Sequence, residues 1–298
     1  MRPALTALGA AAALALPQLA SASLLTQWNL IARNGVNSSS EVDGSALIGG
    51  DLTGPSSNYA VQGVTASNGT GLAVGGNITS TNIQVNNAGD LRVSGTVFGN
   101  ANLNGGGSQI ADPTIPALVS AAFAEANAAS TFFSSLTTNG TLDSAGNMNA
   151  SPATISGQSI AVYSISQSQI QSLGQLNLNL GSADTVVINF TPDTSGNANF
   201  AAPPNIIGGF NQNNASRIVW NIPAATSVIV NNSFNGALLA PSADLQLLGG
   251  GINGTVVVDS VSAQNAEIRR FTYAGAIPAP ATACLMGAVG LAAVRRRR

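Results

Sequence analysis

The sequence predicts a mainly β protein, an irregular β-solenoid (β-helix) with one long flanking helix. The prediction starts from two stretches near the end of the chain, where residues 235–240 (NGALLA) are echoed eighteen residues later by residues 253–258 (NGTVVV). An Asn-Gly pair supplies a turn that few other residues can make, and each pair leads into an apolar, strand-like run. Because one short coil cannot bury its own apolar face, a turn-strand unit returning at this spacing indicates stacked coils.

The composition supports this fold class and excludes several functions. The chain has 298 residues with 33 Gly, 45% apolar and only 7% charged residues, which argues against disorder and favours a β repeat over a helical bundle. It has no Lys and no His, and between residues 23 and 276 five Arg oppose twelve acids, a balance of −7. Such a body offers no electrostatic surface to nucleic acid. The lone Cys284 excludes an intramolecular disulfide.

The first 22 residues have the three parts of a secretory signal peptide. Arg2 gives the positive start, residues 5–16 form an apolar helix, and Ala20 and Ala22 are the small residues recognised before a cut. We therefore expect signal peptidase to remove residues 1–22, so that the exported chain begins at Ser23.

The last 22 residues, 277–298, form a second targeting segment. Its apolar helix, residues 282–294, is about 20 Å long at 1.5 Å per residue, short of the ~30 Å hydrocarbon core, so we expect only transient insertion in the inner membrane. The flanking residues are Pro278, Ala279 and Pro280 before the helix and Arg295, Arg296, Arg297 and Arg298 after it. The four arginines would stay on the cytoplasmic side. This tail resembles the PEP-CTERM sorting signal of Gram-negative bacteria, with Ala279 in place of the usual Glu, which implies processing by an exosortase-type enzyme. A plain C-terminal anchor is the alternative.

Three Gly-containing runs open the body between these ends. In residues 46–52 alternate positions are Ala, Ile, Gly and Leu, and residues 72–78 repeat the pattern. Residues 91–97 repeat it again, with Arg92, Ser94 and Thr96 expected on the outer side. The unequal spacing of the three runs predicts coils of unequal length.

The middle of the body changes character. Residues 113–136 carry an apolar stripe at helical spacing with Thr114 as a candidate cap, which predicts the long flanking helix. Residues 137–158 are expected to form a loop, as is the segment around Pro203-Pro204 and Gly208-Gly209. Further strands are expected at residues 159–165, 176–180, 185–190, 217–222, 227–230 and 268–273.

Five segments together resemble a known family, the choice-of-anchor A domain: residues 28–30 (WNL), 42–44 (VDG), 48–52 (IGGDL), 236–244 (GALLAPSAD) and 250–256 (GGINGTV). This family occurs on bacterial surface proteins with varied C-terminal anchors, and some of its members resemble collagen-binding adhesins. The resemblance implies an exported, surface-held, β-rich domain over residues 23–276. It transfers no catalytic residue.

Motifs for chemistry are scarce. Residues 249–254 match the dinucleotide fingerprint G-x-G-x-x-G, but they precede a strand-like run instead of a helix, so we interpret them as a solenoid turn. Without His, the Ser-His-Asp and Cys-His mechanisms and the usual zinc sites are absent. The carboxylate pairs open to glycoside hydrolysis are Asp43 with Asp51 and Asp244 with Asp259, although their spacing equally suits solvated turn acids.

We therefore expect no catalytic residue and no cofactor. Calcium is the one ion left open, with Asp43, Asp51 or Asp90 as ligands, although the G-G-x-G-x-D calcium pattern is not present.

These observations favour a non-enzymatic protein of the cell surface or the extracellular biofilm matrix. In this hypothesis Asn, Ser and Thr side chains on the solenoid bind polysaccharide or another surface through many uncharged hydrogen bonds. Two alternatives stay open: an ice-binding-like surface protein, by analogy of fold, and a secreted glycan-active enzyme.

Overall fold

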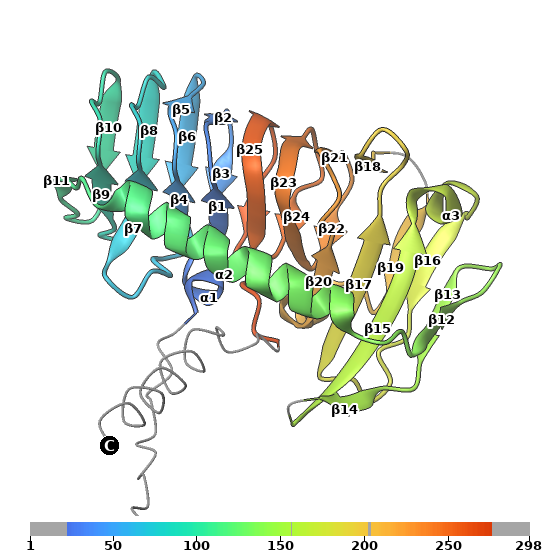
Figure 1. Ribbon diagram of the computed structural model, residues 1–298. Coiled ribbons are helices and arrows are strands. Elements are labelled where there is room, and N and C mark those ends of the chain that lie inside the picture. The colour runs from blue at the N-terminus through green and yellow to red at the C-terminus, as the bar shows by residue number, and fades with distance from the viewer. Residues whose placement is uncertain (1–22, 156, 202–203, 276–298) are drawn as a thin grey trace, which may run out of the picture.

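The computed structural model describes residues 23–155, 157–201 and 204–275. The chain winds into a β-solenoid with three faces, in which strands of successive coils pair in parallel (Figure 1). The predicted mainly β, β-helix-like fold is confirmed.

The first face is a continuous sheet. Its strands, in spatial order, are β11 (Gln109–Ala111), β9 (Asp90–Val93), β7 (Thr70–Val74), β4 (Ala46–Ile48), β1 (Leu30–Ala32), β25 (Val256–Gln264), β23 (Ala237–Leu247), β20 (Ile218–Asn221), β17 (Thr185–Thr191), β15 (Gln158–Ser166) and β14 (Ala153–Ile155).

The second face shares the long strands of the first, because β23 and β25 continue around a corner. It contains, in order, β18 (Asn197–Phe200), β21 (Ser227–Val230), the later halves of β23 and β25, β2 (Val36–Ser38) and β5 (Leu52–Thr53). Isolated bridges from Leu52 to Ile78 and from Ile78 to Val97 extend it.

The third face is divided into two sheets. The longer contains β10 (Asn100–Leu103), β8 (Asn82–Val85), β6 (Ser56–Tyr59), β3 (Glu41–Val42), β26 (Ile268–Arg269), β24 (Ile252–Asn253) and β22 (Phe234–Asn235). The shorter contains β12 (Gly140–Leu142), β13 (Asn147–Ala150), β16 (Gln175–Leu178) and β19 (Asn205–Gly208). Short helical segments are α1 (Leu24–Gln27), α3 (Gln167–Gln171) and the 3-10 turn η1 (Gln212–Arg217).

The coils do not stack in chain order. The chain starts at β1 in the middle of the first face and builds coils outward to β11. The helix α2 (Ile115–Ser135) then runs back along the flank to the other end, and the remaining coils return to the middle (Figure 1). There β25 pairs in parallel with β1, Val257 opposite Ile31, which joins the two halves of the sheet.

Two apolar cores hold this arrangement. Side chains that point inward from all three faces, such as Leu30, Val85 and Leu245, form the solenoid interior. On the first face the alternate side chains point outward and are also apolar, as Ile31 and Leu239 are, and α2 covers them. A strand buried on both sides carries a continuous apolar run, which accounts for the runs seen in the sequence.

The two copies of the eighteen-residue Asn-Gly repeat lie opposite each other on neighbouring coils. Phe234 and Asn235 pair in parallel with Ile252 and Asn253, and the Asn253 Nδ2 donates to Asn235 Oδ1 at 2.8 Å. The predicted interpretation of residues 249–254 as a solenoid turn is confirmed, because Gly250 and Gly251 have positive φ and lead into β24.

The three early runs also stack, Ala46 opposite Leu72 and Leu72 opposite Leu91, but none is a single strand. Each turns a corner between the first and second faces at its glycines. A Cβ on Gly49 would lie 2.0 Å from the Arg33 carbonyl oxygen, and one on Gly75 would lie 2.4 Å from that of Gly49. Glycine is required there because the backbones of successive coils touch at the corner.

α2 lies within the range expected for the helix, 113–136, and buries Ile115, Val119, Phe123 and Phe133 toward the first face. Thr114 occupies the cap position, but its side chain accepts no capping hydrogen bond; its hydroxyl donates to Asp112 Oδ1 at 2.6 Å.

Two loop predictions were wrong. Residues 137–158 contain β12 and β13, which pair antiparallel with each other, and β14, which pairs antiparallel with β15; the segment around Gly208-Gly209 contains β19. Antiparallel cap strands this short carry no apolar alternation by which the sequence could identify them. The strand expected over 268–273 is limited to β26.

Candidate functional site: a polar ladder on the third face

The third face presents uncharged polar side chains in register across three neighbouring coils. Along β8 the side chains of Ile83 and Val85 are fully buried, so Asn82 and Gln84 between them point outward. The same alternation occurs on β6 and β10, and the strands pair so that like positions stand side by side. We call this set the amide ladder: Ser56, Asn58, Asn82, Gln84, Asn86, Asn100, Asn102 and Asn104.

Hydrogen bonds between neighbouring coils fix the ladder. The Asn102 Nδ2 donates to Asn82 Oδ1 at 2.8 Å, and Asn104 Nδ2 lies 2.9 Å from Asn86 Oδ1 and 3.1 Å from Gln84 Oε1. Each primary amide has two N–H donors and an oxygen with two lone pairs, so bonding along the ladder leaves hydrogen-bonding groups directed to solvent. Asn82, Gln84, Asn86, Asn102 and Asn104 thus hold one another in place before any ligand arrives.

The centre of the third face, where the two halves of the solenoid meet, is charged. Glu41 on β3 lies beside β26, where Arg269 forms a 2.6 Å ion pair with Glu267. Burial raises the pKa of Glu41, helped by the nearby charges of Glu267 and Asp43. Burial likewise raises the pKa of Asp43, against the hydrogen bond that it accepts from the Arg270 backbone N–H.

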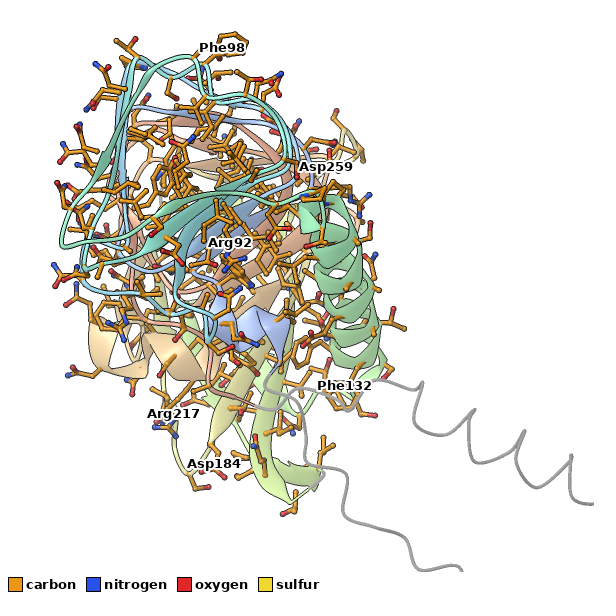
Figure 2. The ribbon with its side chains drawn as sticks, turned by 90° about the vertical axis from the view of Figure 1, so that its left-hand side faces the viewer. Arg92, Phe98, Phe132, Asp184, Arg217 and Asp259 are labelled. Atoms are coloured by element: carbon orange, nitrogen blue, oxygen red, sulfur yellow. The ribbon has the colours of Figure 1, made fainter. Side chains whose placement is uncertain are left out.

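The second face has a mixed outer surface. Pairing across it aligns Asn199, Ile229 and Gln246, and at the other end Thr53 stands beside Thr79 and Phe98. Phe98 is 70% exposed and projects from the edge of the solenoid (Figure 2). A regular row of one residue type is therefore not formed on this face within the described residues.

Of the three residues expected on the outer side of the run 91–97, Thr96 is exposed, whereas Arg92 and Ser94 are half-buried and contact Asp112. Arg92 pairs with Asp112 at 3.3 Å, and Ser94 Oγ donates to the Asp112 carbonyl oxygen at 2.6 Å. These contacts tie the last coil to the start of α2.

The candidate carboxylates are engaged at coil corners. Asp51 accepts from the Asn77 backbone N–H at 2.6 Å, and Asp90 accepts from that of Ser108 at 2.9 Å. The hydroxyls of Ser260 and Ser262 donate to Asp244, and Asp259 lies 3.7 Å from the Arg33 guanidinium.

The Arg33 guanidinium also lies 4.4 Å from the centre of the Phe123 ring of α2. Within residues 23–155, 157–201 and 204–275, no three Asp, Glu, Cys or His side chains are grouped so that they could hold a metal ion.

The predicted processing residues fall mostly outside the described part of the chain. These are Ala20 and Ala22 of the cleavage site, and Pro278, Ala279, Pro280, Arg295, Arg296, Arg297 and Arg298 of the sorting motif. Ser23 is described: its hydroxyl caps α1 and donates to Glu125 on α2, whose other carboxylate oxygen accepts from the Leu24 N–H at 3.0 Å. No helix of the described residues is long and apolar enough to cross a membrane.

The amide ladder is not among the sites predicted from the sequence, although the sequence carries a signal for it. Residues 82–86 (NIQVN) and 100–104 (NANLN) share the alternation of amide and apolar side chains, again eighteen residues apart. This is the same interval as that of the Asn-Gly echo, and both mark one coil of the solenoid.

Comparison with known proteins gives one family and one structure. No curated protein matches the chain. An ice-binding protein from the Antarctic ascomycete Antarctomyces psychrotrophicus is similar at 16% identity, over 81% of this chain and 96% of that chain, with a TM-score of 0.30. A family model described as a putative ice-binding-like adhesive domain matches residues 21–270, nearly the whole described body. The chain belongs to this family of ice-binding-like adhesive domains.

Proposed function

We propose that this protein is a non-enzymatic adhesive protein of the cell surface or extracellular matrix, and that its third face binds neutral polysaccharide. The observation that carries the proposal is the amide ladder, in which hydrogen bonds between Asn and Gln side chains of successive coils hold a set of donors and acceptors in fixed positions. The adhesive character of the family supports it.

Pre-ordering gives the ladder its value for binding. A side chain such as Gln or Asn loses about 0.5–1.5 kcal/mol of rotamer freedom when a ligand immobilises it. In the ladder much of that loss occurs on folding, so weak bonds to sugar hydroxyls need not offset it again. Repetition at the ~4.8 Å spacing of strands then lets many such bonds act together on one polymer.

Charge selects the class of polymer. The body between residues 23 and 276 has a balance of −7 and no Lys, and the ladder itself is uncharged. An anionic polysaccharide would be repelled by this body and would find no cationic partner on the ladder. A neutral, hydroxyl-rich polymer meets neither obstacle.

Export and sorting complete the proposal. The signal peptide at residues 1–22 would direct the chain out of the cytoplasm, and signal peptidase would free Ser23. The tail at residues 277–298 would hold the protein in the inner membrane of a Gram-negative bacterium until an exosortase-type enzyme processes it. In this proposal residues 23–276, the part of the chain between the two signals, are a domain of the choice-of-anchor A kind.

Ice binding is the second candidate function, and the family description favours it. Ice would be bound by a flat, regularly spaced surface, and the ladder has regular spacing although its side chains are amides instead of threonines. Thermal hysteresis of the purified protein separates the two functions, because an adhesin for polysaccharide produces none.

Co-sedimentation with an insoluble neutral polysaccharide tests the main proposal, with cellulose, chitin and a β-1,3-glucan as probes. The Gln84→Arg variant places a long charged side chain in the ladder and breaks the bond from Asn104. Gln246→Arg is the matched control, since Gln246 is also a half-exposed outward residue on a parallel strand, but of the second face. We expect Gln84→Arg to weaken binding at least ten-fold and Gln246→Arg to leave it within two-fold. Equal effects of the two variants would overturn the assignment of the third face.

A further inference from the structure

The third face has a break at one coil boundary where the other two faces are continuous. Between the coil 185–208 and the coil 218–235, β17 pairs with β20 on the first face and β18 with β21 on the second. On the third face β19 ends one sheet and β22 ends the other, and they do not pair. Figure 1 shows β16 and β19 at the end of the solenoid that carries α3.

Large rings in the interior account for this break. Elsewhere the interior is mainly aliphatic with separate rings such as Tyr59 and Tyr163, but here the Trp220 ring lies 5.4 Å from Phe200, 5.4 Å from Phe210 and 5.1 Å from Phe234, centre to centre. Four aromatic side chains need more depth than one coil spacing gives, since strands on a paired face are held ~4.8 Å apart. The third face opens to accommodate them.

The opening leaves two adjoining hollows. One, of about 340 Å³, has an apolar floor that includes Leu176, Phe200 and Phe234 and a polar rim of Asn205, Asn232 and Ser233. The other, of about 400 Å³, shares Ser233 and is lined by neutral polar side chains alone, namely Asn211, Gln212, Asn213, Asn235 and Asn253. We call the two together the wedge.

In the polar hollow the side chains at the back are held by hydrogen bonds, and those at the front are not held by any described residue. At the back Asn253 Nδ2 donates to Asn235 Oδ1, and Asn235 Nδ2 donates to the Phe210 carbonyl oxygen at 3.3 Å. At the front the side chains of Gln212 and Asn213 are exposed and bond to no residue that the structure describes.

One buried atom of this hollow lacks a partner as well. Asn211 Oδ1 is buried and accepts no hydrogen bond from the described residues. A buried acceptor without a donor costs free energy, and a hydroxyl donor in the hollow would satisfy it.

The lining defines the ligand class. The Arg269 guanidinium, 3.5 Å from Asn253 Oδ1, is neutralised by Glu267 at 2.6 Å. A neutral ligand with many hydroxyl groups on one side and an aliphatic C–H face on the other fits both hollows, and a pyranose has this form. The volumes lie at the lower end of the range of about 300–1,000 Å³ for small-molecule sites.

We propose that the wedge is a saccharide subsite that takes a terminal or branch pyranose of a neutral polysaccharide. This rests on the proposed function and deepens it, because the amide ladder would hold the polymer and the wedge would select one sugar of it. The Asn-Gly echo of the sequence acquires a role here, since Asn235 and Asn253 form the back of the site.

Chemical-shift mapping on the ¹⁵N-labelled protein tests the wedge directly. The probes are glucose, galactose, N-acetylglucosamine and their β-1,4-linked disaccharides, titrated to high millimolar concentration. We expect one stereochemistry to shift the signals of Asn213, Ser233 and Asn253 in a saturable way. Shifts that are the same for every sugar and do not saturate would overturn the proposal.

Ser233→Phe blocks the wedge, and Ser39→Phe is its matched control. Both serines are exposed, both lie at the corner that precedes the third face, and each hydroxyl donates to a carbonyl oxygen of the next coil at 3.3 Å. We expect Ser233→Phe to weaken disaccharide binding at least ten-fold and Ser39→Phe to change it less than two-fold. Equal affinity of both variants would refute the site.

The two proposals can fail separately. If Gln84→Arg abolishes polysaccharide binding while no small saccharide shifts the wedge signals, the wedge proposal is refuted and the ladder proposal stands. If saccharides bind the wedge but Gln84→Arg leaves polysaccharide binding unchanged, the wedge stands and the ladder does not.

Discussion

Asn221 on β20 is the side chain whose replacement tests most sharply how α2 is held on the first face. It is fully buried beneath the helix. The Ser130 hydroxyl donates to Asn221 Oδ1 at 2.6 Å, and Asn221 Nδ2 reaches the Ser130 carbonyl oxygen at 3.1 Å, Ser134 Oγ at 3.0 Å and Asn189 Oδ1 at 2.9 Å. Asn189 Nδ2 in turn donates to the Phe133 carbonyl oxygen at 2.8 Å. In an otherwise apolar interface this network fixes the helix at one position along the sheet.

The Asn221→Leu variant keeps four side-chain heavy atoms branched at Cγ, with methyl groups somewhat larger than the amide, and removes all four contacts. The serine hydroxyls can turn to carbonyl oxygens of their own helix, so they recover part of the loss. Asn189 Oδ1 has no such substitute, and a buried polar group left unsatisfied costs about 1–3 kcal/mol. Adding the lost bonds, we expect unfolding free energy to fall by about 2–4 kcal/mol. For a body of this size that corresponds to a drop in Tm of about 4–16 °C.

Equilibrium unfolding in guanidinium chloride, followed by circular dichroism, measures the change. Asn213→Leu is the control, because Asn213 is exposed and we expect a change within about 0.5 kcal/mol. An unchanged m-value would show that the loss belongs to the native state. If Asn221→Leu is as stable as the unmodified protein, apolar packing alone holds α2, and the reasoning about the polar network is wrong.

Two further predictions concern single carboxylates. The folded-state pKa of Glu41 is raised, mainly by burial and then by Glu267 and Asp43, so its ionised form destabilises the fold above that pKa and the penalty vanishes below the unfolded pKa of about 4.3. Glu41→Gln should therefore raise Tm at pH 7 and leave it unchanged near pH 3.5, in thermal scans at both values; an equal Tm at pH 7 contradicts this. Glu125 holds Ser23 and the Leu24 N–H, so a protein cut to begin at Ser23 gains an ammonium beside this carboxylate. Glu125→Gln should lower Tm more in the cut protein than in one retaining a short N-terminal extension, and equal losses in both would rule out this ion pair.

Features that recur in successive coils could be predicted from the sequence, whereas contacts that occur at one place in the fold could not. The echo at residues 235 and 253 and the stacking of residues 46, 72 and 91 could be predicted because parallel coils place like residues in register. The corners could not be predicted, because the sequence pattern does not distinguish a glycine at a corner, where two backbones touch, from a glycine inside a strand. The antiparallel cap at residues 137–158 has no repeat at all.

The closure of the solenoid is likewise absent from the local sequence. β1 pairs with β25, a strand more than 200 residues away in the sequence. The feature of the sequence that is compatible with this pairing is that both strands carry apolar side chains on each side. The amide ladder was within reach, since residues 82–86 and 100–104 alternate visibly. The wedge was not, because apart from the echoed Asn235 and Asn253 its residues come from α3, β16, β18, β19, β22, η1 and the loops beside them, which no spacing connects.

The closure also determines how the two parts of the third face can act together. Because the halves of the solenoid join at β3 and β26, the charged centre with Glu41 and Arg269 separates the amide ladder from the wedge. From β6, the ladder strand nearest the wedge, to β24, the wedge strand nearest the ladder, the sheet contains three strand intervals, about 14 Å at ~4.8 Å each. A saccharide shorter than this span can occupy the ladder or the wedge, and a longer one can occupy both. Affinity should therefore rise steeply once the polymer exceeds that length, through effective concentration instead of any new contact. If the proposed function holds, a site built this way would retain a long polymer and release its short breakdown products.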